Sequence, residues 1–221
     1  MENLSTYKIG IMKSLINSAR EIMKEEGLDN ITIRKVGERA RLNSATIYNY
    51  FENLEHLKIF ACLFVFDEYI EDIENYIKED GNVIENYFGI WECFIKHTII
   101  DAEVYYNIFF NKLERKISEY VEEYYLLFPF KNKNYGKSID KMLSSSSVEN
   151  RNIILLEEMA DKGYLDKKDI NWVNDLSVYS YESILFRVYK NNIGKEEAAK
   201  KMFNYIKKIL KENMLLNEKD R

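Results

Sequence analysis

The segment Thr32–Tyr50 carries the side chains with the most specific chemistry in the sequence. It holds four basic residues against a single acidic one, Glu38, in a chain whose net charge is −5. Its second half, Ser44–Asn49, consists mainly of small or polar side chains. Basic groups bind phosphate oxygens, whereas small polar and amide side chains can reach base edges in the major groove. The segment therefore has the composition of a surface that contacts double-stranded DNA.

Two short helices are expected to position these side chains. Thr32 can cap the first helix, because its hydroxyl can accept a hydrogen bond from the free N–H groups of the first turn. Arg41–Leu42 would form a turn, and Asn43 can cap a second helix over Ser44–Tyr50. The first helix has an apolar stripe at helical spacing, made of Ile33, Val36 and Ala40. The sequence thus predicts a helix-turn-helix.

The run Ile31–Phe51 resembles the DNA-binding signature of the TetR family of bacterial one-component transcriptional regulators. The resemblance is specific over about Tyr7 to Lys58 and only architectural beyond that. Three residues outside the run, Gly27, Asn53 and Leu57, also fit the family pattern. The best matches inside it are Thr32, Ile33, Val36, Ala40, Ser44, Thr46, Ile47, Tyr48, Tyr50 and Phe51.

Three positions are unusual for this pattern. Arg41 stands in the turn where glycine is usual, and a positive φ there would strain an arginine but not a glycine. Leu54 stands where the family commonly has a phosphate-binding lysine, so that Lys58, one turn later, is the substitute. Gly37 lies inside the first helix, where glycine costs about 1 kcal/mol relative to alanine.

The resemblance implies a role for each polar residue of the motif. In a symmetric dimer, two recognition helices would lie roughly 34–36 Å apart, or a multiple of that, and would read a near-palindromic operator. Asn49 could make a bidentate pair with adenine. The residues expected to face base edges are Ser44, Ala45, Thr46 and Asn49. Those expected to hold phosphates are Thr32, Arg34, Lys35, Tyr48, Tyr50 and Lys58.

The composition predicts an all-α fold. The 221 residues include one proline and eight glycines, and no stretch keeps the strict alternation of a strand. We expect a three-helix DNA-binding domain at residues 1–58, followed by a helical-bundle domain for ligand binding and dimerisation at residues 59–221. The first domain carries 9 basic and 8 acidic residues, against 23 and 29 in the second, which suits a protein that docks DNA at one end.

Most of the other elements follow from apolar periodicity and from cap residues. Residues 129–147 are expected to be irregular, although Ser146 and Glu149 could form a capping box. The helix that begins at Asn53 would join the two domains in a TetR-type protein. The expected helices outside the motif are Tyr7–Glu26, Asn53–Glu79, Asn82–Ile100, Ala102–Lys112, Arg115–Leu127, Val148–Lys162, a helix from Asp166 to Asn191, and Lys195–Asn217.

The second domain is rich in aromatic residues, which can be core filler or the lining of a ligand cavity. The TetR resemblance implies a pocket for a small-molecule effector within residues 82–190, and the aromatic content suggests an apolar or aromatic effector. The resemblance also implies a homodimer through the last two helices; alternatively, their apolar stripes pack within the monomer. The candidate pocket residues are Trp91, His97, Tyr105, Phe109 and Trp172.

Enzymatic and metal chemistry receive less support. Cys93 and His97 stand four residues apart on one helical face, but two ligands are too few for a structural zinc ion, and the sequence does not show whether Cys62 joins them. Neither histidine has the Glu-x-x-His spacing of di-iron bundles, and no phosphate-binding glycine loop is present. We therefore expect no catalytic site, no metal and no cofactor.

Further features bear on location. Two cysteines without a disulfide framework suit a reducing cytoplasm, and residues 1–8 do not read as a signal peptide. The longest uncharged apolar run, Ile59–Phe66, is too short to cross a membrane. The sequence thus predicts a cytoplasmic DNA-binding regulator, most simply a repressor that an effector releases from its operator. The alternative is a helical small-molecule sensor or interaction protein without DNA binding. The effector, the operator and the direction of regulation stay open.

Overall fold

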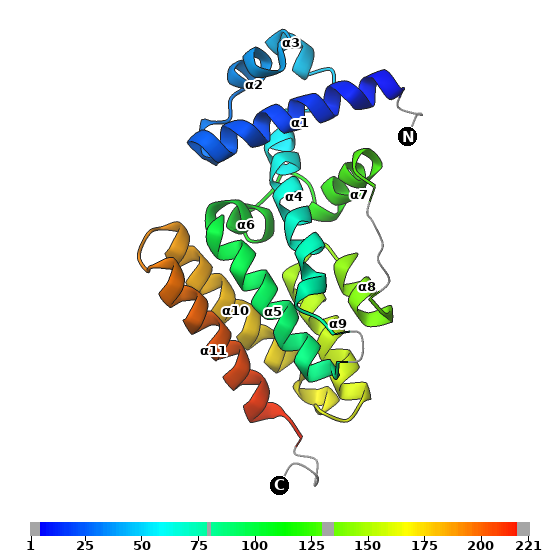
Figure 1. Cartoon of the computed structure of the whole chain (residues 1–221), viewed down its shortest axis with the longest axis vertical. Coiled ribbons are helices and arrows are strands. Elements are labelled where there is room, and N and C mark those ends of the chain that lie inside the picture. Colours follow the sequence, from blue (N-terminus) through cyan, green and yellow to red (C-terminus); the bar gives the residue numbers. More distant parts are fainter. Residues whose placement is uncertain (1–4, 79–80, 130–134, 216–221) are drawn as a thin grey trace. The chain divides into compact units, whose positions relative to one another are not determined.

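The computed structural model describes residues 5–78, 81–129 and 135–215 (Figure 1). These residues form eleven α-helices and three short 3₁₀ helices, and the described part contains no strand beyond one isolated bridge, Leu165 with Met214. The all-α prediction is confirmed. The α-helices are α1 Thr6–Glu26, α2 Ile33–Ala40, α3 Ser44–Ile47, α4 Leu54–Asp72, α5 Val83–Ile100, α6 Ala102–Phe109, α7 Ile117–Leu127, α8 Lys137–Leu143, α9 Val148–Asp161, α10 Ile170–Tyr189 and α11 Lys195–Asn213.

Side-chain caps explain where several helices begin. Thr32 accepts a hydrogen bond from the backbone N–H of Lys35, and Asn82 accepts from the first turn of α5. Asn43 likewise caps α3. Each cap satisfies an N–H group that the helix itself leaves free. At the other end of α1, Gly27 adopts a φ of 93°, which glycine reaches without steric cost.

Several predicted boundaries were wrong. The α-helix α3 ends at Ile47 rather than Tyr50, because the next N–H groups bond three residues back in a tight turn. The helix expected to reach Glu79 ends at Asp72 and is followed by the 3₁₀ helix Ile73–Asn75. Part of the segment expected to be irregular forms α8, while residues 130–134 lie outside the described part. Ser147, not Ser146, caps α9.

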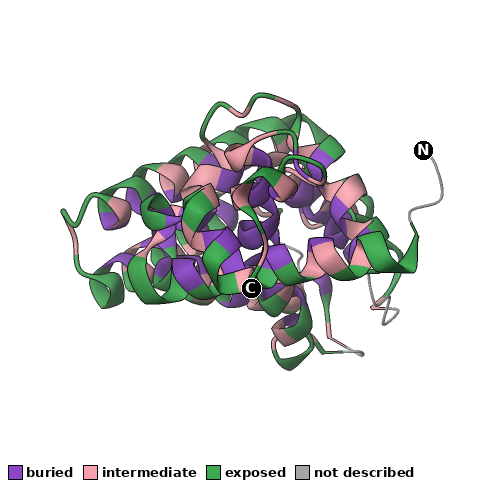
Figure 2. Ribbon diagram, turned by 90° about the horizontal axis from the view of Figure 1, so that it is seen from above, coloured by how far each residue is buried: buried purple, intermediate pink, exposed green. Residues whose placement is uncertain are grey.

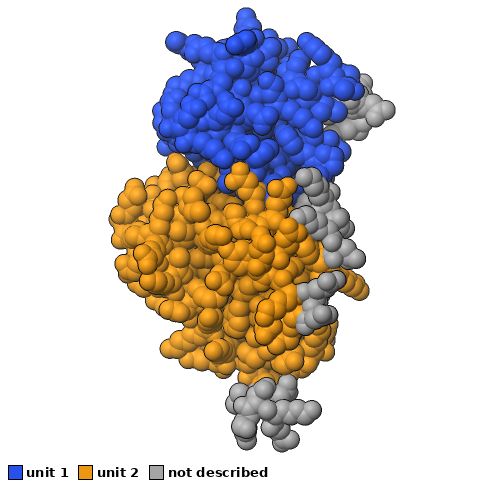
Figure 3. All heavy atoms as spheres, viewed as in Figure 1, with its two compact units in different colours: residues 1–67, 113–131 blue, residues 68–112, 132–221 orange. Residues whose placement is uncertain are grey.

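The chain divides into two compact units, shown in different colours in Figure 3. Unit 1 comprises residues 1–67 and 113–131, and unit 2 comprises residues 68–112 and 132–221. The sequence-based boundary at residue 58 falls inside α4, which runs from one unit into the other. The inclusion of α7 in unit 1 was not anticipated from the sequence.

Polar and aromatic contacts within unit 1 bind α7 to the start of α4. The guanidinium of Arg115 contacts Glu52 at 3.2 Å and Glu123 at 2.7 Å. The hydroxyl of Tyr124 donates to Asp67 Oδ2 at 2.7 Å. The contacts Arg115–Glu52 and Tyr124–Asp67 join residues about sixty positions apart, so periodicity along the sequence could not predict them.

His56 lies buried in this cluster, with its ring 4.6 Å from that of Phe60 between centroids. Its Nδ1 accepts a hydrogen bond from the backbone N–H of Glu52, which places the proton of the neutral ring on Nε2. Nε2 lies 3.3 Å from Glu123 without forming a hydrogen bond. Burial lowers the pKa of His56 and outweighs the carboxylate of Glu123, which acts in the opposite direction. The folded protein therefore favours the neutral imidazole.

This arrangement predicts a pH-dependent stability. Because the folded pKa lies below the ordinary value of 6.5, the contribution of His56 is complete above that pH and is lost as the pH falls through the folded pKa. The melting temperature should fall between about pH 7 and about pH 5, and His56→Gln should reduce that fall. Calorimetry that gives equal pH profiles for the wild type and His56→Gln would contradict this prediction.

Unit 2 is built around α5, whose residues are buried on most of its surface. Figure 2 shows the buried residues gathered in the interior of the ribbons. Within this unit α5 packs with α9, α10 and α11, and α10 packs along α11 (Figure 1). Phe94 on α5 is the centre of an aromatic cluster with Trp91, Tyr105, Phe109 and Tyr181. The unit thus has an aromatic core made by helices from distant parts of the chain.

Candidate nucleic-acid interface and effector cavity

The turn between α2 and α3 is closely packed. Arg41 adopts the left-handed conformation, with φ 56° and ψ 40°, so the strain expected for a non-glycine residue is present. A Cβ atom on Gly37 would lie 2.9 Å from the carbonyl oxygen of Leu42 and 3.2 Å from the hydroxyl of Ser44. Glycine in α2 therefore lets the first helix approach the turn, which offsets its low helix propensity.

The residues expected to face DNA bases lie in one short, accessible stretch. Ala45 and Asn49 are exposed, whereas Ser44 and Thr46 are half-buried. Tyr48 is 59% exposed, which is unusual for so large an aromatic side chain and leaves its hydroxyl free to reach a phosphate. Ile47 is fully buried and anchors the stretch to the rest of unit 1. The recognition element is thus one helical turn extended by a tight turn.

The basic residues of α2 are paired with acids in the free protein. Arg34 contacts Glu38 at 2.8 Å, and Lys35 contacts Glu26 at 2.5 Å. Both pairs are solvent-exposed, and such pairs are worth little, so phosphate oxygens can replace the acids. Arg39 is different, because two of its nitrogens bind the carboxylate of Glu25. Its role is to fasten α2 to α1.

The remaining phosphate candidates lie around this stretch. Tyr50 is half-buried after α3, and Lys58 is half-buried on α4. Thr32 is exposed, but its hydroxyl already caps α2. Leu54 is the first residue of α4, and its uncharged side chain cannot bind a phosphate as a lysine would. The ten residues named from the sequence thus lie at the start of α2, on α3 and the turn after it, and, for Lys58, on α4.

The five candidate pocket residues do not converge on one cavity. Trp91 lines a small buried cavity, whereas Tyr105 and Phe109 pack in the aromatic core, and His97 contacts Asp72. Trp172 does not line that cavity, and its side chain is 59% exposed on α10. The helical phase of α10 could not be derived from the sequence, since both of its faces carry aromatic residues.

The cavity beside Trp91 is lined by apolar residues and by two polar ones that the sequence did not single out. It offers about 20 Å³ to the centre of a water-sized molecule, which is room for about one water. Trp91 Nε1 donates to Asn152 Oδ1 at 3.1 Å, and Asn152 in turn donates to Asn174 at 3.0 Å. The guanidinium of the buried Arg151 donates to the carbonyl oxygens of Leu143 and Ser145. The cavity thus combines aromatic walls with fixed polar groups.

Buried hydroxyls accompany this network. Those of Tyr87, Ser177 and Tyr181 make no hydrogen bond within the described part of the chain. An unsatisfied buried hydroxyl is unfavourable, and water or a polar ligand atom can relieve it. These groups are therefore available to orient a ligand that opens the core.

The fold and the α2–α3 geometry together define a two-unit, all-helical protein with a helix-turn-helix near its N-terminus. Residues 15–57 match the model of the bacterial regulatory proteins of the tetR family. The matched residues include α2 and α3, so this part of the chain is similar to the DNA-binding helix-turn-helix of that family. The chain is also 36% identical over 44 residues to YdeS of Bacillus subtilis (strain 168), an uncharacterized HTH-type transcriptional regulator; the match spans 20% of this chain and 22% of YdeS.

Solved structures extend the likeness to the whole fold. FadR from Thermus thermophilus, a TetR-family repressor solved with lauroyl-CoA, matches with a TM-score of 0.60 at 13% identity over 94% of this chain and 96% of that protein. RolR in complex with resorcinol matches with a TM-score of 0.60 at 15% identity over 95% and 90% of the two chains. At such low identities these matches show a shared fold. Separately, no helix in the described residues is long and apolar enough to cross a membrane.

Proposed function

We propose that the protein is a DNA-binding transcriptional regulator that acts as a homodimer and is released from a near-palindromic operator when a small molecule binds unit 2. The observation that supports this most strongly is the α2–α3 motif, with its exposed Tyr48 and Asn49 beside basic residues whose present partners are solvent-exposed acids. Direct reading of bases would come from Ser44, Ala45, Thr46 and Asn49. The phosphate contacts would fix the register of this stretch in the groove.

A surface on α10 supports the dimer. Trp172, Tyr179 and Phe186, named here the α10 stripe, recur every seven residues and are 59%, 62% and 40% exposed. Residues at this spacing share one face of a helix. Tyr205 adds a 46% exposed aromatic side chain on α11, the helix that packs along α10. Exposed large apolar side chains of this kind are what a second copy of the same helices would cover.

An effector that binds beside Trp91 would have to open the core of unit 2. Ligand pockets usually measure about 300–1,000 Å³, which is far more than the cavity beside Trp91 offers. An apolar or aromatic molecule with a few polar atoms suits the aromatic walls and the hydroxyls of Tyr87, Ser177 and Tyr181. Binding would release DNA only if the effector favours an expanded unit 2 over the present one.

The test is operator binding by wild-type and variant dimers. Asn49→Ala should relax the preference at one base step by about 1–3 kcal/mol, because it removes a bidentate contact. Asn192→Ala, at an exposed asparagine of unit 2, is the matched control and should bind like the wild type. Fluorescence anisotropy with duplexes that carry single base changes measures both. Unchanged base preference in Asn49→Ala would exclude the proposed contact.

A further inference from the structure

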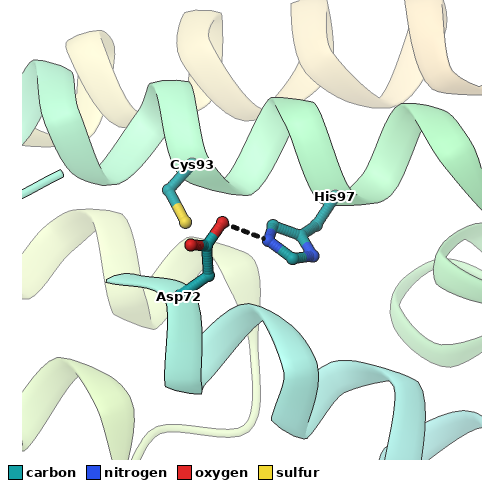
Figure 4. A group of neighbouring side chains, drawn as sticks. All are labelled: Asp72, Cys93 and His97. Carbon is teal, nitrogen blue, oxygen red and sulfur yellow. Dashed lines mark hydrogen bonds and ion pairs between the residues drawn. The ribbon is translucent and has the colours of Figure 1, made fainter. Parts of the chain in front are cut away.

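One cluster in unit 2 is not used by the proposed function. Asp72 ends α4, and Cys93 and His97 lie one turn apart on α5 and face it (Figure 4). One ligand atom from each residue, a carboxylate oxygen, a sulfur and an imidazole nitrogen, lies within 4.8 Å of the other two. The sequence identified the Cys93–His97 pair but could not supply the third residue. Cys62 is not that residue, because it lies in unit 1 with its sulfur 4.0 Å from that of Met23.

These three groups form a ligand set that transition metals favour. Zn²⁺ binds thiolate, imidazole and carboxylate, and a thiolate disfavours Mg²⁺ and Ca²⁺. Three protein ligands leave one tetrahedral position open, in contrast to the four ligands of structural zinc sites. A thiolate and a carboxylate together also neutralise a divalent ion. The three ligand types therefore favour a transition metal over Mg²⁺ and Ca²⁺, and their number suffices for a tetrahedral site with one open position.

The geometry requires only small movements to hold an ion. In a tetrahedral site with bonds of about 2.0–2.3 Å, ligand atoms lie roughly 3.3–3.8 Å apart. His97 Nε2 and Asp72 Oδ2 are 2.8 Å apart, so they must separate slightly, while the third ligand moves inward. An ion would take the place of the direct contact between His97 and Asp72. Asp72 and His97 are 25% and 20% exposed, which gives an ion access from solvent.

Some neighbouring residues favour the binding of an ion and one disfavours it. Asn75 donates to Asp72 Oδ1 at 2.8 Å, and such outer contacts hold ligating carboxylates in place. Lys96 Nζ lies 3.5 Å from Asp72 Oδ2, where its charge opposes a cation. However, the lysine is exposed and its main partner is the hydroxyl of Tyr76 at 2.7 Å. The unfavourable charge of Lys96 therefore lies at the surface, and a substitution of this residue can remove it.

Burial raises the pKa of Cys93 to about 12, so its sulfur is a thiol in the free protein, close to the carbonyl oxygen of Tyr69. An ion must displace that proton, because the thiolate is the form that binds a metal. Cys93 is fully buried, which suits a ligand that needs protection from oxidation and from solvent.

We propose that Asp72, Cys93 and His97 form a three-ligand site for Zn²⁺ or a similar divalent transition metal, with the fourth position open to water or to an exogenous ligand. This site does not depend on the proposed function, because the metal can be measured without DNA. It would fix the end of α4 to α5, since its ligands come from both helices.

The test is titration of the full chain, stripped of metal with a chelator, with Co²⁺ as a spectroscopic substitute for Zn²⁺. The wild type should develop a thiolate-to-cobalt charge-transfer band and the intense visible bands of tetrahedral Co²⁺, and Zn²⁺ should abolish both by competition. Cys93→Ser should lose the charge-transfer band, whereas Cys62→Ser, the other buried cysteine, should keep it. Circular dichroism confirms that each variant is folded.

A further variant tests the site without removing a ligand. Lys96→Gln should bind Co²⁺ more tightly than the wild type by about threefold to tenfold, because it removes a cation at the surface. The proposal would be overturned by a wild type without a charge-transfer band, by a band that depends on Cys62, or by Lys96→Gln binding more weakly.

Discussion

Replacing Tyr179 with glutamate is expected to convert the protein from a dimer to a monomer and to abolish tight operator binding. Tyr179 is the central residue of the α10 stripe and is 62% exposed in the single chain. In a symmetric interface the substitution is present twice, so two carboxylates would be placed in an apolar contact region. Like charges brought together at an interface cost several kcal/mol, which corresponds to at least about 100-fold weaker association.

Light scattering coupled to size exclusion measures the mass of each variant at matched concentrations. Tyr7→Glu is the control, because Tyr7 is 77% exposed on α1 and lies outside the α10 stripe. We expect this control to stay a dimer, while Tyr179→Glu elutes as a folded monomer. A Tyr179→Glu dimer of unchanged stability would mean that other surfaces hold the copies together.

Gly89→Ala is expected to be the most destabilising conservative change in unit 2. A Cβ atom at Gly89 would lie 2.0 Å from the carbonyl oxygen of Tyr76, which is backbone and cannot rotate away. Helix α5 would therefore have to move from the segment after Ile73–Asn75, against its close packing in the core. Overpacking of this kind costs about 1–3 kcal/mol or more, which in a chain of this size lowers the melting temperature by roughly 2–12 °C.

Gly10→Ala is the matched control. Gly10 is exposed in α1, and a Cβ atom there would meet nothing within 4 Å. The same substitution should therefore stabilise the protein by up to about 1 kcal/mol through helix propensity. Thermal unfolding of both variants separates the steric effect from the propensity effect, and a Gly89→Ala variant as stable as the wild type would refute the close approach of Tyr76.

The local elements could be predicted from the sequence because their determinants are local. Thr32 and Asn43 mark helix starts by side-chain oxygens that act within three residues, and each is observed as a cap. The helix-turn-helix was predicted for the same reason. Helix α8 was missed because its sequence, KSIDKML, is short and follows a segment rich in polar residues and glycine.

The tertiary relations could not be predicted, because they depend on partners far along the chain. Arg115 brings α7 to Glu52, and Asp72 meets His97, only once the helices are packed. The candidate pocket residues were chosen from aromatic content, which does not tell a core residue from an exposed one such as Trp172. Gly37 is a similar case. Its low helix propensity predicted a loss of stability, and only the close approach of the Leu42 carbonyl oxygen to α2 explains why a glycine stands there.

The most direct test of DNA binding is the affinity of the purified protein for the DNA upstream of its own gene, measured as a function of salt against a scrambled duplex. We expect preferential binding to a near-palindromic site, with an affinity that falls as salt rises because phosphate contacts release counterions. Equal affinity for both duplexes could place the operator elsewhere, but no binding to either duplex at low salt would contradict the account. In that case α2 and α3 would serve only to pack unit 1.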